Sequence, residues 1–341
     1  MKNKSIIYLF LYLFFLGSCT DNNKRITFDN MQQIECVSIP YSDILGISMQ
    51  LLLKDSLLLI NDFYGDSLIH ILDIKNNYKH KKLVAKGNGP NEFISPIAIY
   101  MTNDNLYLYE RQTFRLFSMP IDMLLYENKE IKNKFKTDAR TMMLFPLSDS
   151  MFVSSTSDGT KPFNIYNSNG EKMREFGEYP AYWHKEVDLP NRVRAFYHQT
   201  FFEKHPSQKM FVAYSGHVLG IYKYESIYQD PILRKEILLS NYNYKFIDNG
   251  TLLTAERDDD VERGILTVAC SANYIYMVYN PNKKGGEDML SHQIKIIDWN
   301  GNPIKQLNIN KQATCLVIDE IEEKGYIIAN DPEDTLMYFY L

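Results

Sequence analysis

The chain has 341 residues, with 42 Asp and Glu against 37 Lys and Arg, and a formal net charge of −5 at pH 7. This mildly acidic balance argues against nucleic acid as a partner. The length allows one large or two ordinary domains with a sizeable core. Four cysteines are few for an exported protein, and their spacing matches neither a CxxC motif nor a zinc-ligand set. We therefore expect Cys36, Cys270 and Cys315 to be small buried side chains within strands, and we predict no metal site from them.

The first 18 residues have the pattern of a processing segment. Two lysines precede an apolar run at 6–16, which is too short to span about 30 Å of hydrocarbon as a helix. A cleavable signal peptide over 1–18 explains this pattern better. The sequence LGSC at 16–19 then resembles the lipobox of bacterial lipoproteins, and the resemblance implies that Cys19 carries a lipid. The alternative is an ordinary secretory signal in which Cys19 is incidental.

Residues 19–33 are polar at their start and are expected to form a lipidated tether. Because the acidic chain offers no polybasic segment for binding membranes, the lipid on Cys19 would be the anchor. We therefore expect a protein of the cell envelope that is attached to a membrane, the outer one, through its N-terminus. Which face of that membrane it occupies stays open.

Beyond residue 33, short runs rich in Tyr, Phe, Ile, Val and Leu alternate with polar turns, and long amphipathic helical patterns are nearly absent. This pattern is typical of an all-β domain. Four turns share an Asp-Ser or Asp-Thr pair followed by an apolar residue, at 55–57, 66–68, 149–151 and 334–336. The Asp side chain is expected to bond its own backbone in the turn before the next strand begins. Such self-similarity predicts a repeat architecture.

The predicted strands fall into six units. In chain order they lie at 47–53, 57–61, 68–73 and 82–85; at 96–101, 106–110 and 114–117 with a fourth strand within 123–135; at 141–147, 151–155, 163–167 and 172–176; at 196–203, 210–214, 218–224 and 233–239; at 264–270, 274–279, 293–298 and 304–309; and at 314–319, 326–330 and 336–340. Asn-Gly pairs at 169–170 and 300–301 are expected to form hairpin turns.

The last unit has only three strands, while the run 34–39 stands before the first unit with none of its own. We expect this N-terminal strand to pair with the last unit, which closes a ring and removes an open sheet edge. The prediction is an all-β, six-bladed β-propeller over residues 34–341. Five or seven blades stay open, because 123–135 and 248–262 are difficult to assign.

The best-preserved unit, 86–117, resembles an NHL-type repeat. It carries GNGPNEF at 87–93, then Pro96, NLY at 105–107 and Arg115, although Glu110 stands where that repeat has Asp. With the lipobox, the size and the composition, the chain resembles the six-bladed TolB-like propeller lipoproteins of Bacteroides-type bacteria. The resemblance implies the fold and the envelope location, and it implies no catalytic residues.

In such bacteria, triplets of Asp, Ser or Thr, and an apolar residue are similar to O-glycosylation sites. The resemblance makes four side chains candidate acceptors: Ser56, Ser67, Ser150 and Thr335. Turn chemistry accounts for the same triplets equally well.

Two loops invite a ligand interpretation that their details do not support. The loop of Gly87, Gly89 and Pro90 lacks the Lys-Ser/Thr pair and the helix of a phosphate-binding loop, so we interpret it as a tight crossover where Gly supplies a positive φ. The acidic run 256–263 (ERDDDVER) lacks the alternating ligands of a calcium loop. We expect it to be a solvated charged loop.

The long connection 177–193 breaks the repeat and carries large side chains, which favours a functional role. Tyr182, Trp183 and His184 are the predicted ligand or partner contacts, because exposed aromatic side chains stack on sugars and anchor protein interfaces. A catalytic or metal group is the alternative. It would combine these residues with Glu186, Asp188, His198 and His205, for which we favour packing and surface polarity instead.

We therefore expect a binding or interaction module without catalysis and without a cofactor, whose mouth carries the connections 177–193 and 248–262. Its partner would be an envelope protein or a glycan. One alternative is a metal-dependent hydrolase of lactones or esters, with calcium or another divalent cation in the central channel. Another is a glycan-binding accessory lipoprotein. No GxSxG or HExxH motif supports catalysis.

Overall fold

The computed structural model describes residues 25–41, 45–89, 91–125, 130–248, 250, 253–283, 285, 289–330 and 334–341. The predicted signal peptide, the first part of the tether and Cys19 lie outside these residues. No helix in the described part of the chain is both long and apolar enough to cross a membrane.

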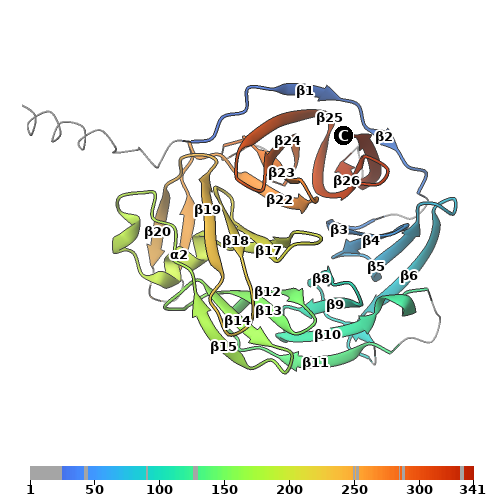
Figure 1. Ribbon diagram of the computed structural model, residues 1–341, viewed down its shortest axis with the longest axis horizontal. Coiled ribbons are helices and arrows are strands. Elements are labelled where there is room, and N and C mark those ends of the chain that lie inside the picture. The colour runs from blue at the N-terminus through green and yellow to red at the C-terminus, as the bar shows by residue number, and fades with distance from the viewer. Residues whose placement is uncertain are drawn as a thin grey trace, which may run out of the picture.

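The strands form twisted sheets arranged like blades around a common centre (Figure 1). Four blades are separate sheets: β3–β6 (Ser48–Lys54, Leu57–Asp62, Ser67–Asp73, Lys79–Lys86), β8–β11 (Ile97–Met101, Asn105–Glu110, Arg115–Pro120, Lys132–Lys136), β12–β15 (Thr141–Ser148, Met151–Thr156, Phe163–Asn167, Lys172–Phe176) and β16–β19 (Phe201–Lys204, Met210–Tyr214, Val218–Lys223, Ile232–Leu238).

The fifth and sixth blades share the long strand β25 (Pro303–Asp319). Its first half pairs with β24 (Ser291–Asp298), beside β23 (Tyr274–Asn280) and β22 (Gly264–Cys270). Its second half pairs with β26 (Lys324–Asn330), which pairs with β27 (Asp334–Tyr340). The predicted six-bladed, all-β architecture is confirmed.

Burial falls from the middle of each blade to its rim. Strand β5 (SLIHILD) is buried on both faces because neighbouring blades cover both, whereas the outer strand β19 begins with four exposed residues. Aromatic rings fill the seams between blades. Phe152 meets Tyr107 and Phe135 edge to face, with ring centroids 5.4 and 5.3 Å apart. Each such pair adds about 0.5–1.5 kcal/mol to the hydrophobic stabilisation of the seam.

The N-terminal segment pairs with the last blades, as predicted, but as two short strands. β1 (Met31–Ile34) runs parallel to the first half of β25, and β2 (Val37–Ser38) is antiparallel to β27 (Figure 1). Between them the Cys36 N–H donates to the Asn310 side chain at 2.9 Å, where β25 passes from one blade to the next. The prediction of a single strand at 34–39 is wrong, because the segment passes from the fifth blade to the sixth near Cys36 and pairs with each blade separately.

Blade four begins later than predicted. The expected strand 196–203 starts inside helix α2 (Asn191–Tyr197), and β16 begins only at Phe201. Pro190 precedes the helix, and Val193 and Ala195 form its buried side. The Arg194 guanidinium donates to the carbonyls of residues 179 and 180 at 2.8 and 3.0 Å, which holds the two ends of the connection together.

The unassigned stretch 248–262 contains half of a hairpin, formed by β20 (Tyr244–Asp248) and β21 (Leu253–Arg257). This hairpin lies beside α2 at the outer side of blade four (Figure 1). Two inserted segments that are far apart in the sequence therefore pack on each other.

The loop after β6 is a crossover, as predicted, but the predicted role of its glycines is wrong. β7 (Glu92–Phe93) pairs parallel with the end of β6, and the Gly89 N–H donates to the Glu92 carboxylate at 2.8 Å. Neither Gly87 nor Gly89 has a positive φ; Asn91 does. A side chain on Gly87 would overlap the Glu92 carboxylate, which is the movable end of a long side chain and would have to turn away. Pro90 lies outside the described residues.

The three described cysteines have free thiols. Cys270 and Cys315 lie in strands β22 and β25, as predicted, whereas Cys36 is half-buried between β1 and β2. Gly170 and Gly301 have φ of +80° and +81°, which confirms the hairpin turns expected at both Asn-Gly pairs.

Candidate functional site

A central cavity of about 770 Å³ lies along the axis of the blades. The first strand of every blade contributes to its wall: β3, β8, β12, β16, β22 and the second half of β25. Apolar and aromatic side chains such as Met143, Phe145 and Leu316 make up about half of the lining, and polar and charged groups make up the rest. The volume is typical of pockets that hold a small organic ligand, and the lining is more polar than most such pockets.

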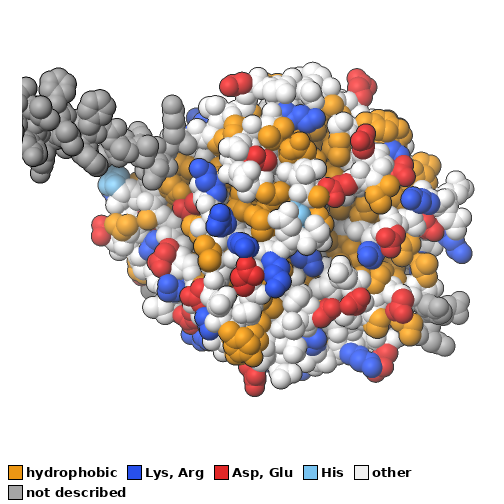
Figure 2. Space-filling model, in the orientation of Figure 1, with side chains coloured by type: hydrophobic (Ala, Val, Ile, Leu, Met, Phe, Trp, Pro, Cys, Tyr) orange, Lys and Arg blue, Asp and Glu red, His pale blue; other side chains and the backbone are white. Residues whose placement is uncertain are grey.

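The two ends of the cavity differ in charge. The connections that lead into the first strands lie at one end, which we call the entry mouth, and the turns that leave them lie at the other, the exit mouth. Among the described lining residues, Arg111, Arg257 and Arg263 lie at the entry mouth. Asp55 and the pair Asp319–Glu320 lie at the exit mouth. Among these lining residues the entry mouth is thus basic, and the exit mouth, where Lys204 at the end of β16 also lies, has an acidic excess. Figure 2 shows one face of the molecule, where Lys and Arg side chains gather left of the centre among apolar ones.

The interior of the cavity holds a carboxyl group that titrates near neutral pH. Burial raises the pKa of Glu203 to about 7, against the opposing effects of the Lys204 N–H and ammonium. Burial also raises the pKa of the Tyr100 and Tyr214 phenols and of the Cys270 thiol well above their ordinary values. At neutral pH the interior therefore offers neutral hydrogen-bonding groups beside one carboxyl group that is partly protonated.

A buried carboxylate ties the two inserted segments together. Glu186, in a short 3₁₀ turn of the connection, is fully buried. Its carboxylate lies 2.5 Å from His198 Nε2 and accepts bonds from the hydroxyls of Tyr242 at 2.8 Å and Tyr244 at 3.0 Å. Burial acts to raise the pKa of Glu186, but these three partners outweigh it and hold the pKa below its ordinary value. Tyr197 of α2 stacks on Tyr244 at 3.8 Å and extends this cluster to the cavity wall.

The predicted contact residues lie away from the cavity. The Tyr182 hydroxyl donates to Glu236 on the outer strand β19 at 2.6 Å, and half-buried Trp183 packs on Tyr244. Only His184 is exposed. No described residue of 177–193 lines the cavity; its nearest lining residues, Phe196, Tyr197 and Gln199, follow the connection in the chain. A contact role for Tyr182, Trp183 and His184 stays a prediction, now for the outer rim of blade four.

Of the alternative catalytic group, the structure joins only Glu186 and His198. His205 bonds the Ala272 carbonyl at 3.0 Å at the opposite end of its blade. Neither exposed residue, His184 or Asp188, takes part in the Glu186 cluster. The described residues contain no group of three or more His, Cys, Asp or Glu that could hold a metal ion. The metal-dependent hydrolase stays an untested prediction.

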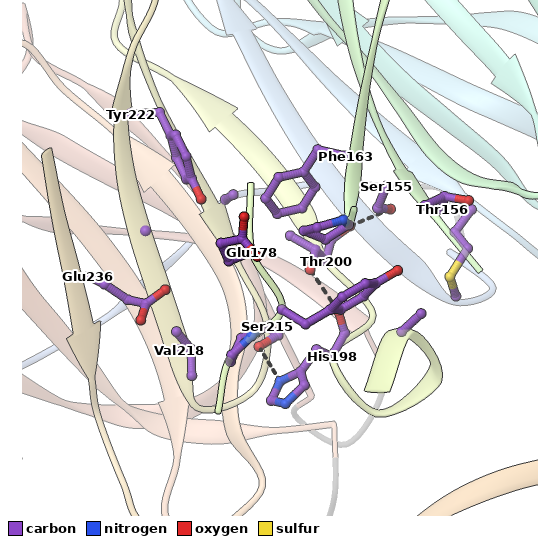
Figure 3. Close-up of a pocket in the computed structure, with 17 residues that line it drawn as sticks. Ser155, Thr156, Phe163, Glu178, His198, Thr200, Ser215, Val218, Tyr222 and Glu236 are labelled. Carbon is purple, nitrogen blue, oxygen red and sulfur yellow. Dashed lines mark hydrogen bonds between the residues drawn. The ribbon is translucent and has the colours of Figure 1, made fainter. Parts of the chain in front are cut away.

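A small pocket between blades three and four borders this cluster (Figure 3). His198 Nδ1 lies 3.5 Å from Ser215 Oγ, so Ser215, His198 and Glu186 follow one another like a hydrolytic triad. All three are buried, however, and the pocket measures only about 30 Å³. That volume holds one or two water molecules and no substrate carbonyl. We therefore interpret the three residues as a structural network.

The acidic run 256–263 is solvated in part, as predicted, because Glu256, Asp259 and Asp260 are exposed, and Asp258 and Glu262 have charged partners. Asp258 lies 3.3 Å from the Lys245 ammonium. Glu262 pairs with Arg25 at 3.4 Å and accepts a bond from the Tyr279 hydroxyl. These contacts fix the chain between the hairpin and β22.

Two of the four Asp residues in the repeated triplets, Asp149 and Asp334, bond to a neighbouring blade, although bonds within their own turns were predicted. Asp149 accepts bonds from Thr102, Asn105 and Tyr107 of the preceding blade at 2.7–3.0 Å. Asp334 accepts the Ser48 N–H of the first blade at 3.1 Å.

Of the candidate O-glycosylation sites, Ser67 is buried and donates to the carbonyls of residues 69 and 84. Ser56 and Thr335 are half-buried, and Ser150 is exposed. O-glycosylation stays a prediction, and exposure favours Ser150 as the acceptor.

The axial cavity and the radiating blades define a β-propeller. A sequence model of the TolB-like 6-blade propeller-like family matches residues 28–321, and the chain belongs to this family. Comparison with functionally curated proteins gave no match.

Two solved structures share the fold. One is a Bacteroides fragilis protein whose name describes it as exported, with 11% identity over 92% of this chain and 97% of that chain, and a TM-score of 0.55. The other is an auxiliary nutrient binding protein from Bacteroides thetaiotaomicron, with 10% identity over 87% of this chain and 69% of that chain, and a TM-score of 0.51.

The sequence contained little trace of this site. Arg111 follows β9, Arg257 ends β21 and Arg263 precedes β22, so no spacing relates Arg111 to the other two. The one usable signal was the position of Arg257 and Arg263 at the two ends of the run ERDDDVER, directly before a predicted blade.

Proposed function

We propose that the protein is a binding module of the cell envelope whose central cavity takes a small anionic ligand through the entry mouth. The observation that carries this proposal is the placement of Arg111, Arg257 and Arg263 at one end of a cavity whose wall also carries apolar and aromatic side chains. Guanidinium groups bind carboxylate and phosphate in pairs of parallel hydrogen bonds. Low-dielectric walls around them focus the positive field and raise the local concentration of anions.

The interior suits a ligand with both a charged end and a less polar body. Below the entry mouth, Tyr100, Phe145 and Tyr214 present ring surfaces and hydroxyls that can contact such a body. An acidic sugar or another small organic carboxylate has this character. The expected glycan partner and the anionic ligand then describe one class, that of carboxylated sugars.

The envelope location is supported by the lipobox-like sequence at 16–19. The names of the two structural neighbours, an exported protein and an auxiliary nutrient binding protein, point the same way. In this proposal Cys19 carries the lipid and the tether runs from Cys19 only as far as Arg25. The predicted tether boundary at residue 33 is too late, because Arg25, Phe28 and β1 already contact the propeller. Changing Cys19→Ser is expected to move the protein from the membrane fraction to the soluble fraction. Retention in the membrane fraction would show that the anchor lies elsewhere.

The ligand class can be tested by thermal shift with matched pairs of compounds. The panel contains galacturonate with galactose, glucuronate with glucose, and glucose 6-phosphate with glucose. At least one charged member is expected to raise the melting temperature more than its neutral partner does. The Arg257→Ala/Arg263→Ala double variant should lose that difference, whereas Arg234→Ala, on the exposed face of β19, should keep it. Equal shifts for every charged and neutral pair in the wild-type protein would refute the proposal.

A further inference from the structure

A separate cluster of polar side chains lies outside the central cavity, where the N-terminal segment meets blade one. His70 is in the middle of β5, and His80 is the second residue of β6. In the antiparallel register Leu72 faces His80, so His70 and His80 are diagonal neighbours. Diagonal neighbours lie on the same face of a sheet. Tyr41 reaches this face from the segment that follows β2.

Three donor atoms converge at this point. The Tyr41 hydroxyl lies 2.8 Å from His70 Nδ1 and 3.3 Å from His80 Nε2, and the two nitrogens are 3.1 Å apart. A tetrahedral zinc ion about 2.0–2.1 Å from each ligand holds them about 3.3 Å from one another. The triangle therefore already has nearly the size of one face of a tetrahedral site.

The second ring nitrogen of His70, Nε2, lies near a buried carboxylate. His70 Nε2 lies 3.8 Å from Asp62 Oδ2, and both side chains are almost fully buried. The Asp62 carboxylate is itself fixed by the backbone N–H groups of Gly46, Ile47 and Gly65 at 2.8–3.1 Å. The negative charge of Asp62 at this distance favours a proton on Nε2 through the electrostatic field, which leaves the Nδ1 lone pair on the side of Tyr41 and His80. In metal sites the same kind of carboxylate usually lies closer and accepts a hydrogen bond from the ligand histidine.

We propose that Tyr41, His70 and His80 form a binding site for a late first-row divalent metal ion, Zn²⁺ or Cu²⁺. Imidazole nitrogens suit both ions, and Cu²⁺ binds a given nitrogen and oxygen site more tightly than Zn²⁺ does. Each ligand loses or lacks a proton when it binds metal, so affinity rises with pH.

The position of the site gives the metal a structural role. Val37 pairs with the last blade only four residues before Tyr41, and Tyr41 packs on an apolar cluster that includes Leu58 of blade one and Tyr326 of the last blade. A metal ion that joins Tyr41 to His70 and His80 therefore fastens the N-terminal segment across the junction of the first and last blades. Because it binds only the folded chain, it stabilises the protein by an amount that grows with metal concentration.

The test is calorimetric titration of untagged, metal-free protein with ZnCl₂ and, separately, with CuSO₄. We expect one equivalent of each ion to bind, with Cu²⁺ the tighter. His80→Gln should weaken binding at least tenfold, and Tyr41→Phe should weaken it while the metal-free protein keeps its melting temperature. His184→Gln, which removes an exposed histidine elsewhere, should bind metal like the wild type.

Electron paramagnetic resonance of the Cu²⁺ complex gives an independent measurement on the wild-type protein alone. Two imidazole ligands predict hyperfine splitting from two nitrogens. The proposal is overturned if the wild type binds neither ion at one equivalent, if His80→Gln leaves the affinity unchanged, or if the spectrum shows no nitrogen ligands. In the first case the three side chains are a hydrogen-bonded cluster only.

Discussion

Removing the Glu186 carboxylate tests how the entry mouth is built. In Glu186→Ala, the side chains of His198, Tyr242 and Tyr244 each lose a buried acceptor. An orphaned buried donor costs about 1–3 kcal/mol, and removing one partner of a buried hydrogen-bonded carboxylate costs up to about 3–5 kcal/mol. We therefore expect the free energy of unfolding to fall by about 4 kcal/mol.

The measurement is denaturant unfolding followed by fluorescence and circular dichroism, with Glu178→Ala as the matched control. Glu178 belongs to the same connection, but its side chain is exposed and pairs with Lys161 at 3.0 Å. An exposed pair of this kind contributes about 0–1 kcal/mol. If Glu186→Ala unfolds within 1 kcal/mol of the wild type, the carboxylate does not hold the two inserted segments together.

The same residue predicts a pH dependence. The pKa of Glu186 lies below its ordinary value in the folded protein, so its stabilisation is fully present above the unfolded pKa of about 4.3 and is lost as the pH falls through the folded pKa. The wild type should therefore lose stability below about pH 4.5, and Glu186→Gln should lose less over that range. Parallel acid unfolding curves for the two proteins would contradict the assignment.

Two further substitutions test the cavity and its seam. Because burial raises the pKa of Glu203 to about 7, the stability of the wild type should fall as the pH rises from about 4.3 to about 7 and then level off. The difference in melting temperature between pH 5 and pH 8 should be smaller in Glu203→Gln. An unchanged difference would show that another group titrates in this range. Gly264 has a φ of +86°, and a side chain there would overlap the carbonyl of Gly216, which accepts the Ile265 N–H at 2.6 Å between blades four and five. Gly264→Ala should lower the free energy of unfolding, measured with denaturant, by about 2–4 kcal/mol. Gly250→Ala, at a similar φ but with open space around it, should lower it by about 1 kcal/mol. Equal losses would show that the contact between blades four and five is not the reason for the loss at Gly264.

The strands were predictable where local signals sufficed. β14 and β15 were predicted to the residue, because Asn169-Gly170 sets the turn between two apolar runs. The start of β16 was not, since Phe196 and Tyr197 have the side chains of a strand but belong to α2. That choice depends on packing against β21, about 60 residues further along the chain. Propensity is a weak guide where such contacts decide.

The site was largely hidden from the sequence for the same reason. The sequence predicted that Tyr182 and Trp183 are exposed. Both are half-buried, because they contact Glu236 and Tyr244, which are more than 50 residues away in the chain. Glu186 was recognised only as one of several acidic residues near histidines. Its partner His198 follows a helix that was not predicted, so their contact could not be derived. Sequence spacing does not show which turns meet around a propeller axis.

The central claim is that the entry mouth selects anionic ligands. It is tested most directly by saturation-transfer difference NMR with galacturonate and galactose in one sample, so that the transfer to the two sugars is compared under identical conditions. The account predicts transfer to galacturonate well above that to galactose in the wild type, and loss of this preference in the Arg257→Ala/Arg263→Ala variant. Equal transfer to both sugars, or a preference that persists in the variant, would contradict it.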